Sequence, residues 1–244
     1  MAEGSGRVNR FYVVLGTLAV VLGATMFMLL RSGGTMSTAA ASAPPRAVVD
    51  DGFRGYTIGS GTAPVEVVEY VDYECPVCAQ FATLQLPTIR QQLIETGKVR
   101  WRVRDYPLAI HQYSRYAAHA VQCAGEQGKA WDMQDQLFDN HGWAQTGKNP
   151  SRLFHDLAKA AGVASLDRYD QCMASGKYAS RIEYSRQEGD SLLVDGTPTF
   201  FIDRKKLAFR RLPTSDDFKT LVDSIIAHRP PPAPSKIAQP HAHH

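Results

Sequence analysis

Two cysteines separated by two residues stand in the stretch YVDYECPVCAQF, residues 70–81. Cys75 and Cys78 at this spacing can do three kinds of chemistry. They can close a structural disulfide, supply half of a zinc site, or act as a reversible redox pair. The choice depends on the elements that position the two sulfurs and on the other ligands that accompany them.

The residues around the pair predict a strand that leads into a helix. The run VEVVEYV, residues 65–71, is rich in β-branched side chains and predicts a largely buried strand. A helix is expected from about Pro76, since proline is tolerated in a first helical turn, to about Thr96, with a kink at Pro87. This arrangement places the sulfur of Cys75 at the start of the helix.

The start of a helix favours a negatively charged sulfur, because unsatisfied backbone N–H groups and the positive end of the helix dipole face it. Cys75 is therefore expected to have a lowered pKa and to be a thiolate. Cys78 sits one helical turn later, close enough to form a disulfide but less accessible. The pair would then divide into a nucleophile and a resolving thiol.

The alternatives to redox chemistry fit less well. A zinc site needs a second CxxC or a suitably spaced Cys/His pair, and the sequence contains neither. Two inert buried thiols are possible, but the outward-facing compartment inferred below and the strand-helix-strand context argue against them. A metal carrier built on the pair would need further soft ligands beside it, and the sequence places none there. Redox chemistry is favoured, with no metal and no cofactor expected.

A second feature lies far along the chain in DGTPTFFID, residues 195–203. Pro198 precedes an expected strand, where a proline usually marks an edge or a turn because it cannot donate a ladder hydrogen bond. A CxxC after the first strand, together with Thr197-Pro198 before a late strand, resembles the thioredoxin fold. That resemblance implies a cis-proline facing the active disulfide.

The resemblance is closer than the fold. The stretches VVEYVDYECPVCAQF, GKVRWRVRDYPLAIHQYSRYAAHAVQCAGEQGKAWDMQDQLF and GTPTFFID together resemble the DsbA-like thiol:disulfide oxidoreductases, including the BdbD-like branch, over about residues 56–227. This implies an enzyme that donates its disulfide to reduced, newly exported proteins and is reoxidised by a membrane quinone-linked partner of the DsbB or VKOR type. Disulfide isomerases and reductants for cytochrome maturation use the same fold and motif, and they remain alternatives.

The resemblance assigns roles to particular residues. Cys75 resembles the family's nucleophile, Cys78 its resolving thiol, and Thr197-Pro198 its substrate-contacting loop. Glu69, six residues before Cys75, matches a buried acid that relays protons to or from the inner cysteine. An acid among valines is costly to bury unless its charge or proton is used. An exposed glutamate at a strand edge is the alternative.

The other two cysteines, Cys123 and Cys172, lie 49 residues apart in the stretch expected to be helical. BdbD-like relatives resemble this arrangement, with a cystine in the helical insertion, so the resemblance implies a structural disulfide. In an oxidising compartment such a bond would stabilise the fold by about 2–4 kcal/mol. Two buried free thiols that pack as small hydrophobes are the alternative.

The remaining patterns predict an α/β fold with an inserted helical subdomain, and the resemblance implies that this fold is thioredoxin-like. Residues 99–104, VRWRVR, alternate as a strand does and complete a parallel βαβ unit with the first strand. Apolar residues recur at helical spacing over about 113–193, which predicts the insertion. The elements expected after it are strands at 199–202 and 207–210, a turn at Asp203-Arg204, and a helix at about 214–227 with capping groups in TSDDF.

The N-terminal segment predicts a membrane anchor. Residues 11–30 are twenty in a row without a charge, and at about 1.5 Å per residue they span a hydrocarbon core of about 30 Å. Arg7 and Arg10 favour a cytoplasmic N-terminus, residues 1–10, and an extracytoplasmic remainder. A cleaved signal peptide is the alternative, but its apolar region is normally about 7–15 residues long.

The segments flanking the expected domain at 50–228 have the composition of linkers. Residues 31–49 predict a flexible tether, and residues 229–244 predict a disordered tail rich in proline and histidine. The net charge is +3 and the basic residues are mostly dispersed, so nucleic acid is not expected as a partner. We therefore expect a single-pass protein of a bacterial cell membrane, with its catalytic domain in the periplasm or cell envelope.

Overall fold

The computed structural model describes residues 23, 25–27, 48–146 and 148–228 of the chain. The chain divides into two units, residues 1–46 and 47–244. The predicted tail and most of the predicted tether lie outside the described residues. The predicted anchor also lies outside them, except for residues 23 and 25–27, which are helical. Within the described part of the chain, no helix has both the length and the apolar character needed to cross a membrane.

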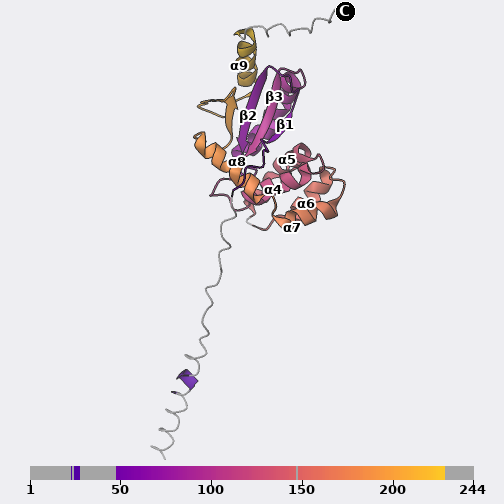
Figure 1. The fold of residues 1–244 in the computed structure, drawn as a ribbon, viewed down its shortest axis with the longest axis vertical. Coiled ribbons are helices and arrows are strands. Elements are labelled where there is room, and N and C mark those ends of the chain that lie inside the picture. The colour runs from indigo at the N-terminus through magenta and orange to yellow at the C-terminus, as the bar shows by residue number, and fades with distance from the viewer. Residues whose placement is uncertain (1–22, 24, 28–47, 147, 229–244) are drawn as a thin grey trace, which may run out of the picture. The chain divides into compact units, whose positions relative to one another are not determined.

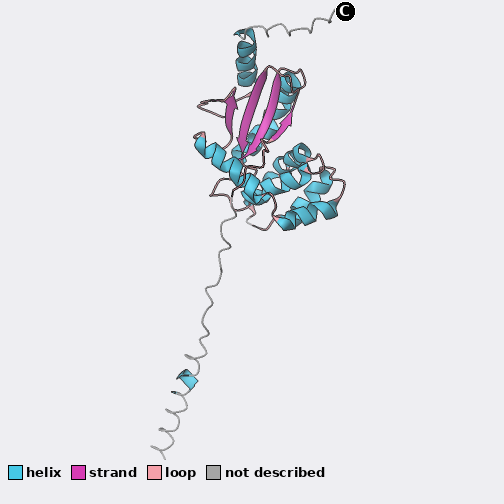
Figure 2. Cartoon of the chain, in the orientation of Figure 1, coloured by secondary structure: helices cyan, strands magenta, loops and turns pink. Residues whose placement is uncertain are grey.

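A five-stranded mixed sheet organises the folded unit (Figure 2). Its strand order is β1-β3-β2-β4-β5, with β2 and β3 parallel and the other neighbours antiparallel. The predicted parallel βαβ unit and the mixed α/β, thioredoxin-like fold are therefore confirmed. The strands are β1 (Tyr56–Ile58), β2 (Val65–Val71), β3 (Val99–Asp105), β4 (Thr199–Ile202) and β5 (Lys205–Lys206).

Helices flank the sheet and fill the stretch between β3 and β4. Those before β3 and after β5 are α2 (Pro76–Leu84), α3 (Leu86–Ile89), the π-helical η1 (Arg90–Ile94) and α9 (Ser215–His228). Those between β3 and β4 are α4 (Ser114–Gly125), α5 (Ala130–Asp139), the 3-10 helix η2 (His141–Gln145), α6 (Ser151–Ala160), α7 (Leu166–Ser175) and α8 (Ala179–Ser191). Helices α4 to α7 gather at one end of the strands (Figure 1).

Four aromatic rings form the centre of the core between the sheet and its helices. Phe81 of α2, Trp101 of β3, Phe200 of β4 and Phe218 of α9 are buried, with ring centroids 4.7–6.0 Å apart. Because side chains alternate along a strand, the odd-numbered residues of β2 and β3 face this cluster and the even-numbered ones face the other side. This alternation points Glu69 into the core.

The prediction of a helical stretch over about 76–96 is confirmed in its extent, since the chain is helical from Pro76 to Ile94 apart from Gln85, but the break lies at Gln85 and not at Pro87. Helix α2 ends at Leu84, and Gln85 (φ −114°, ψ −42°) separates it from α3. Pro87 then lies in the first turn of α3, where a missing N–H removes no helical hydrogen bond. The Gln85 side chain accepts a 3.0 Å hydrogen bond from the backbone N–H of Ser215, which ties this break to the start of α9.

The predicted strand at 207–210 is also wrong. The strand is the two-residue β5, joined to β4 by the expected turn at Asp203-Arg204. The chain leaves the sheet after β5 because its apolar side chains pack on the core. The ring of Phe209, for example, lies 5.9 Å from that of Phe218. The capping groups expected before the last helix are present, since Thr214 and Asp217 hydrogen-bond each other's backbone N–H at the start of α9.

Strand β1 has no counterpart in the sequence-based prediction. Its three residues are too few to show a period of two, and it forms by pairing with β3. Gly55 and Gly59 at its ends have positive φ of 106° and 95°. A side chain at either position would also collide with a backbone carbonyl of β3. The strand therefore depends on two glycines that allow this close approach.

Cys123 of α4 and Cys172 of α7 form a disulfide with a Cα–Cα distance of 5.7 Å. Because they are 49 residues apart, the bond closes a long loop in the unfolded chain. We expect the double variant Cys123→Ala/Cys172→Ala to lose about 2–4 kcal/mol in free energy of unfolding, measured by urea denaturation. The same protein reduced at this bond should unfold as the variant does, and an unchanged midpoint in the variant would contradict a structural role.

Candidate active site

Strand β2 delivers Cys75 to the start of α2. Cys75 is the N-cap residue, with an extended backbone (φ −75°, ψ 121°), and Pro76 follows in the first turn. Both cysteines are free thiols in this structure. Cys75 is 5% exposed and Cys78 0% exposed. The inner cysteine is thus closed off, and only the outer one offers surface to another molecule.

The two thiols have opposite electrostatic environments. The pKa of Cys75 is lowered to about 5, chiefly by hydrogen bonding from the Cys78 thiol. Thr197 and the backbone N–H groups of Cys78 and Val77 add to this effect, and partial burial opposes it. Burial and the neighbouring Cys75 raise the pKa of Cys78 well above its usual value. The site therefore favours a thiolate at Cys75 and a thiol at Cys78.

The structure brings the predicted proline loop to the outer cysteine. The Thr197-Pro198 peptide bond is cis, and the Sγ of Cys75 lies 3.4 Å from the carbonyl oxygen of Thr197. The antiparallel pairing of β2 with β4 places Thr199 opposite Tyr70. The loop before β4 therefore meets the residues after β2, although 122 positions separate Cys75 from Thr197.

Glu69 is buried, with 2% of its surface exposed, so the alternative of an exposed glutamate at a strand edge is wrong. The indole Nε1 of Trp101 donates a 3.0 Å hydrogen bond to its Oε2. Burial raises the pKa of Glu69 to about 7, and the Trp101 hydrogen bond and the charge of Arg90 oppose this shift. A charge on Glu69 in turn raises the pKa of Cys78. The carboxyl can thus exchange a proton near neutral pH and is coupled to the inner cysteine.

Two acids that the sequence-based prediction missed hold the residues before Cys75. The Asp72 carboxylate accepts the backbone N–H of Glu74 and that of Leu108, both at 2.8 Å. It also lies 2.8 Å from the Nδ1 of His111. The Glu74 carboxylate accepts the backbone N–H of Tyr113 at 2.6 Å. The sequence signal that could have identified them is a pair of acids at alternate positions just before the CxxC motif. Their hydrogen-bond partners Leu108, His111 and Tyr113 lie in the segment after β3.

A histidine from the stretch between β3 and β4 also interacts electrostatically with Cys75. Burial lowers the pKa of His141, and the charge of Cys75 acts on it in the opposite direction. Its ring packs edge-on against Trp143, with centroids 5.8 Å apart. The sequence alone does not place His141 within the electrostatic reach of Cys75, because its position depends on how η2 packs.

A groove of about 460 Å³ opens beside the redox pair. Val77, which is 42% exposed, and Pro198 line it. The chain after β5 adds apolar side chains that include Leu207, Phe209 and Leu212. Lys206, Arg210 and Arg211 line the groove as well, so its walls are mixed apolar and basic. A groove of this kind next to a reactive sulfur can hold an extended polypeptide segment whose own cysteine reaches Cys75.

The part of the chain that forms this site resembles known proteins. A family model described as thioredoxin matches residues 54–224, which include the sheet, the cysteine pair and the cis-proline loop. The chain belongs to the thioredoxin family. Disulfide bond formation protein D of Bacillus subtilis is 26% identical over 151 residues, which cover 61% of this chain and 67% of that protein.

Longer proteins also match. The Na(+)/H(+) antiporter NhaA 3 of Salinispora tropica is 35% identical over 154 residues, which cover 63% of this chain but 22% of the antiporter. The chain therefore spans less than a quarter of the length of this relative.

Solved structures show the same fold. The oxidised BdbD of Bacillus subtilis superposes with a TM-score of 0.62 at 25% identity, covering 70% of this chain and 92% of that one. The DsbA of Chlamydia trachomatis gives a TM-score of 0.61 at 16% identity, covering 75% of this chain and 98% of that one. These matches confirm the predicted resemblance to DsbA-like and BdbD-like thiol:disulfide oxidoreductases.

The two thiols of the reduced protein should titrate far apart. We expect the alkylation rate of Cys75 to rise with a midpoint near pH 5, while Cys78 stays unreactive through neutral pH. Since the folded-state pKa of Cys75 is depressed, its contribution to the stability of the reduced protein is lost as pH falls through about 5. Iodoacetamide labelling followed by mass spectrometry measures both sites, with Cys75→Ser as control. A midpoint near that of a free cysteine would contradict the environment described.

Glu69 should make stability fall as pH rises. Its folded-state pKa is raised, so its contribution is complete below the unfolded pKa and is lost as pH rises through about 7. In the oxidised protein, where Cys75 and Cys78 do not titrate, we expect Glu69→Gln to gain about 3 kcal/mol relative to wild type between acid and alkaline pH. Urea denaturation across this range measures it. A difference between the two proteins that does not change with pH would contradict the assignment.

Proposed function

We propose that this chain is an extracytoplasmic protein disulfide oxidase that transfers a Cys75–Cys78 disulfide to exported proteins. The observation that carries the proposal is the Cys75 sulfur at the start of α2, with a lowered pKa, 3.4 Å from the Thr197 carbonyl of the cis-proline loop. A stable thiolate at Cys75 stabilises the reduced form of the pair. The oxidised pair is then a ready disulfide donor.

The reaction would run in two exchanges. A substrate thiolate in the groove attacks the Cys75 sulfur, the Cys75–Cys78 bond breaks, and Cys78 leaves with the electron pair. Because the pKa of Cys78 is high, this sulfur takes up a proton, and Glu69 is the acid that we assign to supply it. A second substrate thiolate then attacks the substrate sulfur of the mixed disulfide, and Cys75 leaves as a thiolate. The substrate loses two electrons and the enzyme gains them.

The reduced pair must be oxidised again before another turnover. We include in the proposal a membrane quinone-linked reoxidant of the DsbB or VKOR type and a single membrane anchor at residues 11–30. The uncharged run of residues 11–30 and the similarity to the Bacillus subtilis disulfide bond formation protein D support these two parts. An anchor would keep the redox domain at the outer face of the membrane, where exported chains emerge.

Other functions have less support. Among the described residues, the group with three potential metal ligands consists of His119, Cys123 and Cys172, and two of these are joined in the disulfide. A metal carrier built on Cys75 and Cys78 therefore lacks further ligands in that part of the chain. Sodium/proton antiport, named in some relatives, is not proposed because the chain spans less than a quarter of the Salinispora antiporter.

The redox potential separates an oxidase from a reductant. We expect the Cys75/Cys78 couple to be clearly more oxidising than that of thioredoxin, which is about −270 mV. Equilibration with glutathione buffers, acid quenching and mass spectrometry give the value. A potential close to that of thioredoxin would remove the oxidase assignment and favour the reductant.

Single cysteine variants test the order of the exchanges. The oxidised wild type should restore disulfides to a reduced, unfolded ribonuclease, and Cys75→Ser should abolish this activity. When scrambled, disulfide-containing ribonuclease is the substrate, Cys78→Ser should instead accumulate a mixed disulfide, because the Cys75 thiolate attacks a substrate disulfide, one substrate sulfur leaves, and no Cys78 thiol is present to resolve the adduct. Non-reducing electrophoresis shows the adduct, and an adduct on Cys78 in the Cys75→Ser variant would reverse the assigned roles.

A further inference from the structure

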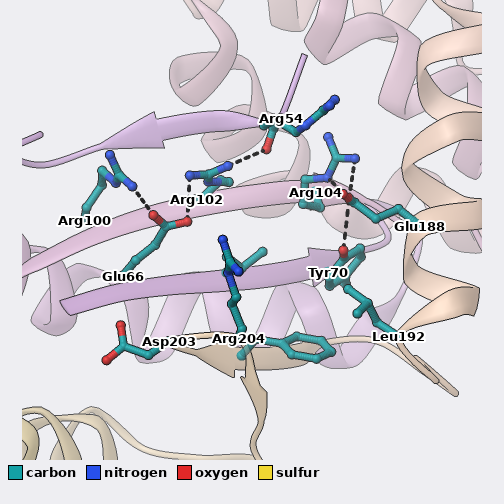
Figure 3. Close-up of a pocket in the computed structure, with 12 residues that line it drawn as sticks. Arg54, Glu66, Tyr70, Arg100, Arg102, Arg104, Glu188, Leu192, Asp203 and Arg204 are labelled. Carbon is teal, nitrogen blue, oxygen red and sulfur yellow. Dashed lines mark hydrogen bonds and ion pairs between the residues drawn. The ribbon is translucent and has the colours of Figure 1, made fainter. Parts of the chain in front are cut away.

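The face of the sheet opposite the aromatic core carries a set of arginines (Figure 3). Arg100, Arg102 and Arg104 alternate along β3 with residues that point into the core, so the three side chains project from the same face. With Arg54 and Arg204 they line a cavity of about 580 Å³. We call this cavity the arginine pocket.

Most arginines of the pocket are held in place by carboxylates. Arg100 and Arg102 pair with Glu66, Arg104 pairs with Glu188, and Arg54 pairs with Asp50. Arg204 differs, because within the described residues it has no hydrogen bond or ion pair. Figure 3 shows its side chain rising from the β4–β5 turn across the pocket. Among the described residues, the pocket therefore contains one guanidinium without a carboxylate partner, that of Arg204, beside arginines that are held in ion pairs.

Arg204 occupies a backbone position that suits glycine. It follows Asp203 in a two-residue hairpin turn, and both residues have positive φ, 46° at Asp203 and 69° at Arg204. Such a turn prefers Asn-Gly or Asp-Gly, since a side chain is strained in this conformation. An arginine in this strained backbone position motivates the hypothesis that its side chain has a function.

The shape and charge of the pocket narrow the choice of ligand. Val68 and Phe201 give it apolar surface, while Glu66, Glu188 and Asp203 lie among its arginines. A flat anionic membrane cannot enter a cavity, and a nucleic acid would bring successive phosphates against these three acids. A small inorganic anion would leave the apolar surface uncovered. The pocket is therefore suited to a ligand that has a carboxylate next to an apolar group.

The sequence offers little acid of its own for this pocket outside the described residues. The residues of the chain beyond those described contain a single acid, Glu3, so they offer no acidic segment. We propose that the arginine pocket binds an acidic, partly apolar peptide segment of a partner protein, with a carboxylate accepted by Arg204. The site goes beyond the proposed function, because it lies on the other face of the sheet and needs no thiol.

A short peptide without cysteine tests this site on the full-length protein. The probe is a fluorescent hexapeptide in which leucine alternates with glutamate, compared with its glutamine counterpart by fluorescence anisotropy. We expect the glutamate peptide to bind and the glutamine peptide to bind at least about tenfold more weakly. Arg204→Gln should lose about the same factor. The matched control is Arg152→Gln, an exposed arginine of α6 outside the pocket, which should bind as wild type does.

A second variant separates binding from folding. Arg204→Gly relieves the turn, so its melting temperature should be equal to or higher than that of wild type, while peptide binding is lost. A lower melting temperature together with lost binding would overturn the proposal, because Arg204 would then serve the fold. Equal binding of both peptides would overturn it too. So would Arg204-dependent binding to phosphatidylglycerol vesicles or inorganic phosphate without binding of the peptide. Cys75 alkylation, measured in parallel, reports the redox site independently.

Discussion

The antiparallel pairing of β2 with β4 brings the residues after one strand against the loop before the other. With Thr199 opposite Tyr70, the carbonyl of Thr197 comes within 3.4 Å of the Cys75 sulfur. The start of α2 supplies the Cys78 thiol and backbone N–H groups to that sulfur. The same loop carries the Thr197 side chain, which helps to lower the pKa of Cys75, and sets Pro198 on the wall of the adjacent groove. Both the reactive atom and the surface beside it thus depend on this register.

The alternation of side chains along β2 and β3 gives the sheet two different chemistries. Glu69 and Trp101 face the core and meet there in a hydrogen bond coupled to the inner cysteine. Glu66 and Arg102, on the other face, form an ion pair in the arginine pocket. A slip of one residue would exchange the two faces and bury the arginines. Because burying the arginines would be energetically costly, the strand register that forms the redox site is also the one that forms the arginine pocket.

The sequence could predict the parts of the site that local patterns encode. The cysteine spacing, the β-branched strand before it and the Thr-Pro before β4 were enough to indicate a redox pair in a thioredoxin-like fold. The break at Gln85 and the two-residue β5 could not be predicted from local patterns. The first involves a hydrogen bond from the Ser215 backbone to the Gln85 side chain, and the second depends on apolar packing after β5. The partners of Asp72 come from the segment after β3 and depend on the fold in the same way.

Burying the Glu69 carboxyl in the core is energetically costly, but the same burial raises its pKa. An apolar residue there would avoid the penalty that ionisation of Glu69 carries above about pH 7. An acid with an ordinary pKa would be ionised at neutral pH and would have no proton to give when Cys78 leaves. Burial in the core, opposed by one hydrogen bond from Trp101, raises the pKa of Glu69 to about 7, so that part of the population is protonated near neutral pH and could serve the proton transfer that we propose. The loss of stability and the availability of the proton therefore have the same cause, and a variant cannot remove one and keep the other.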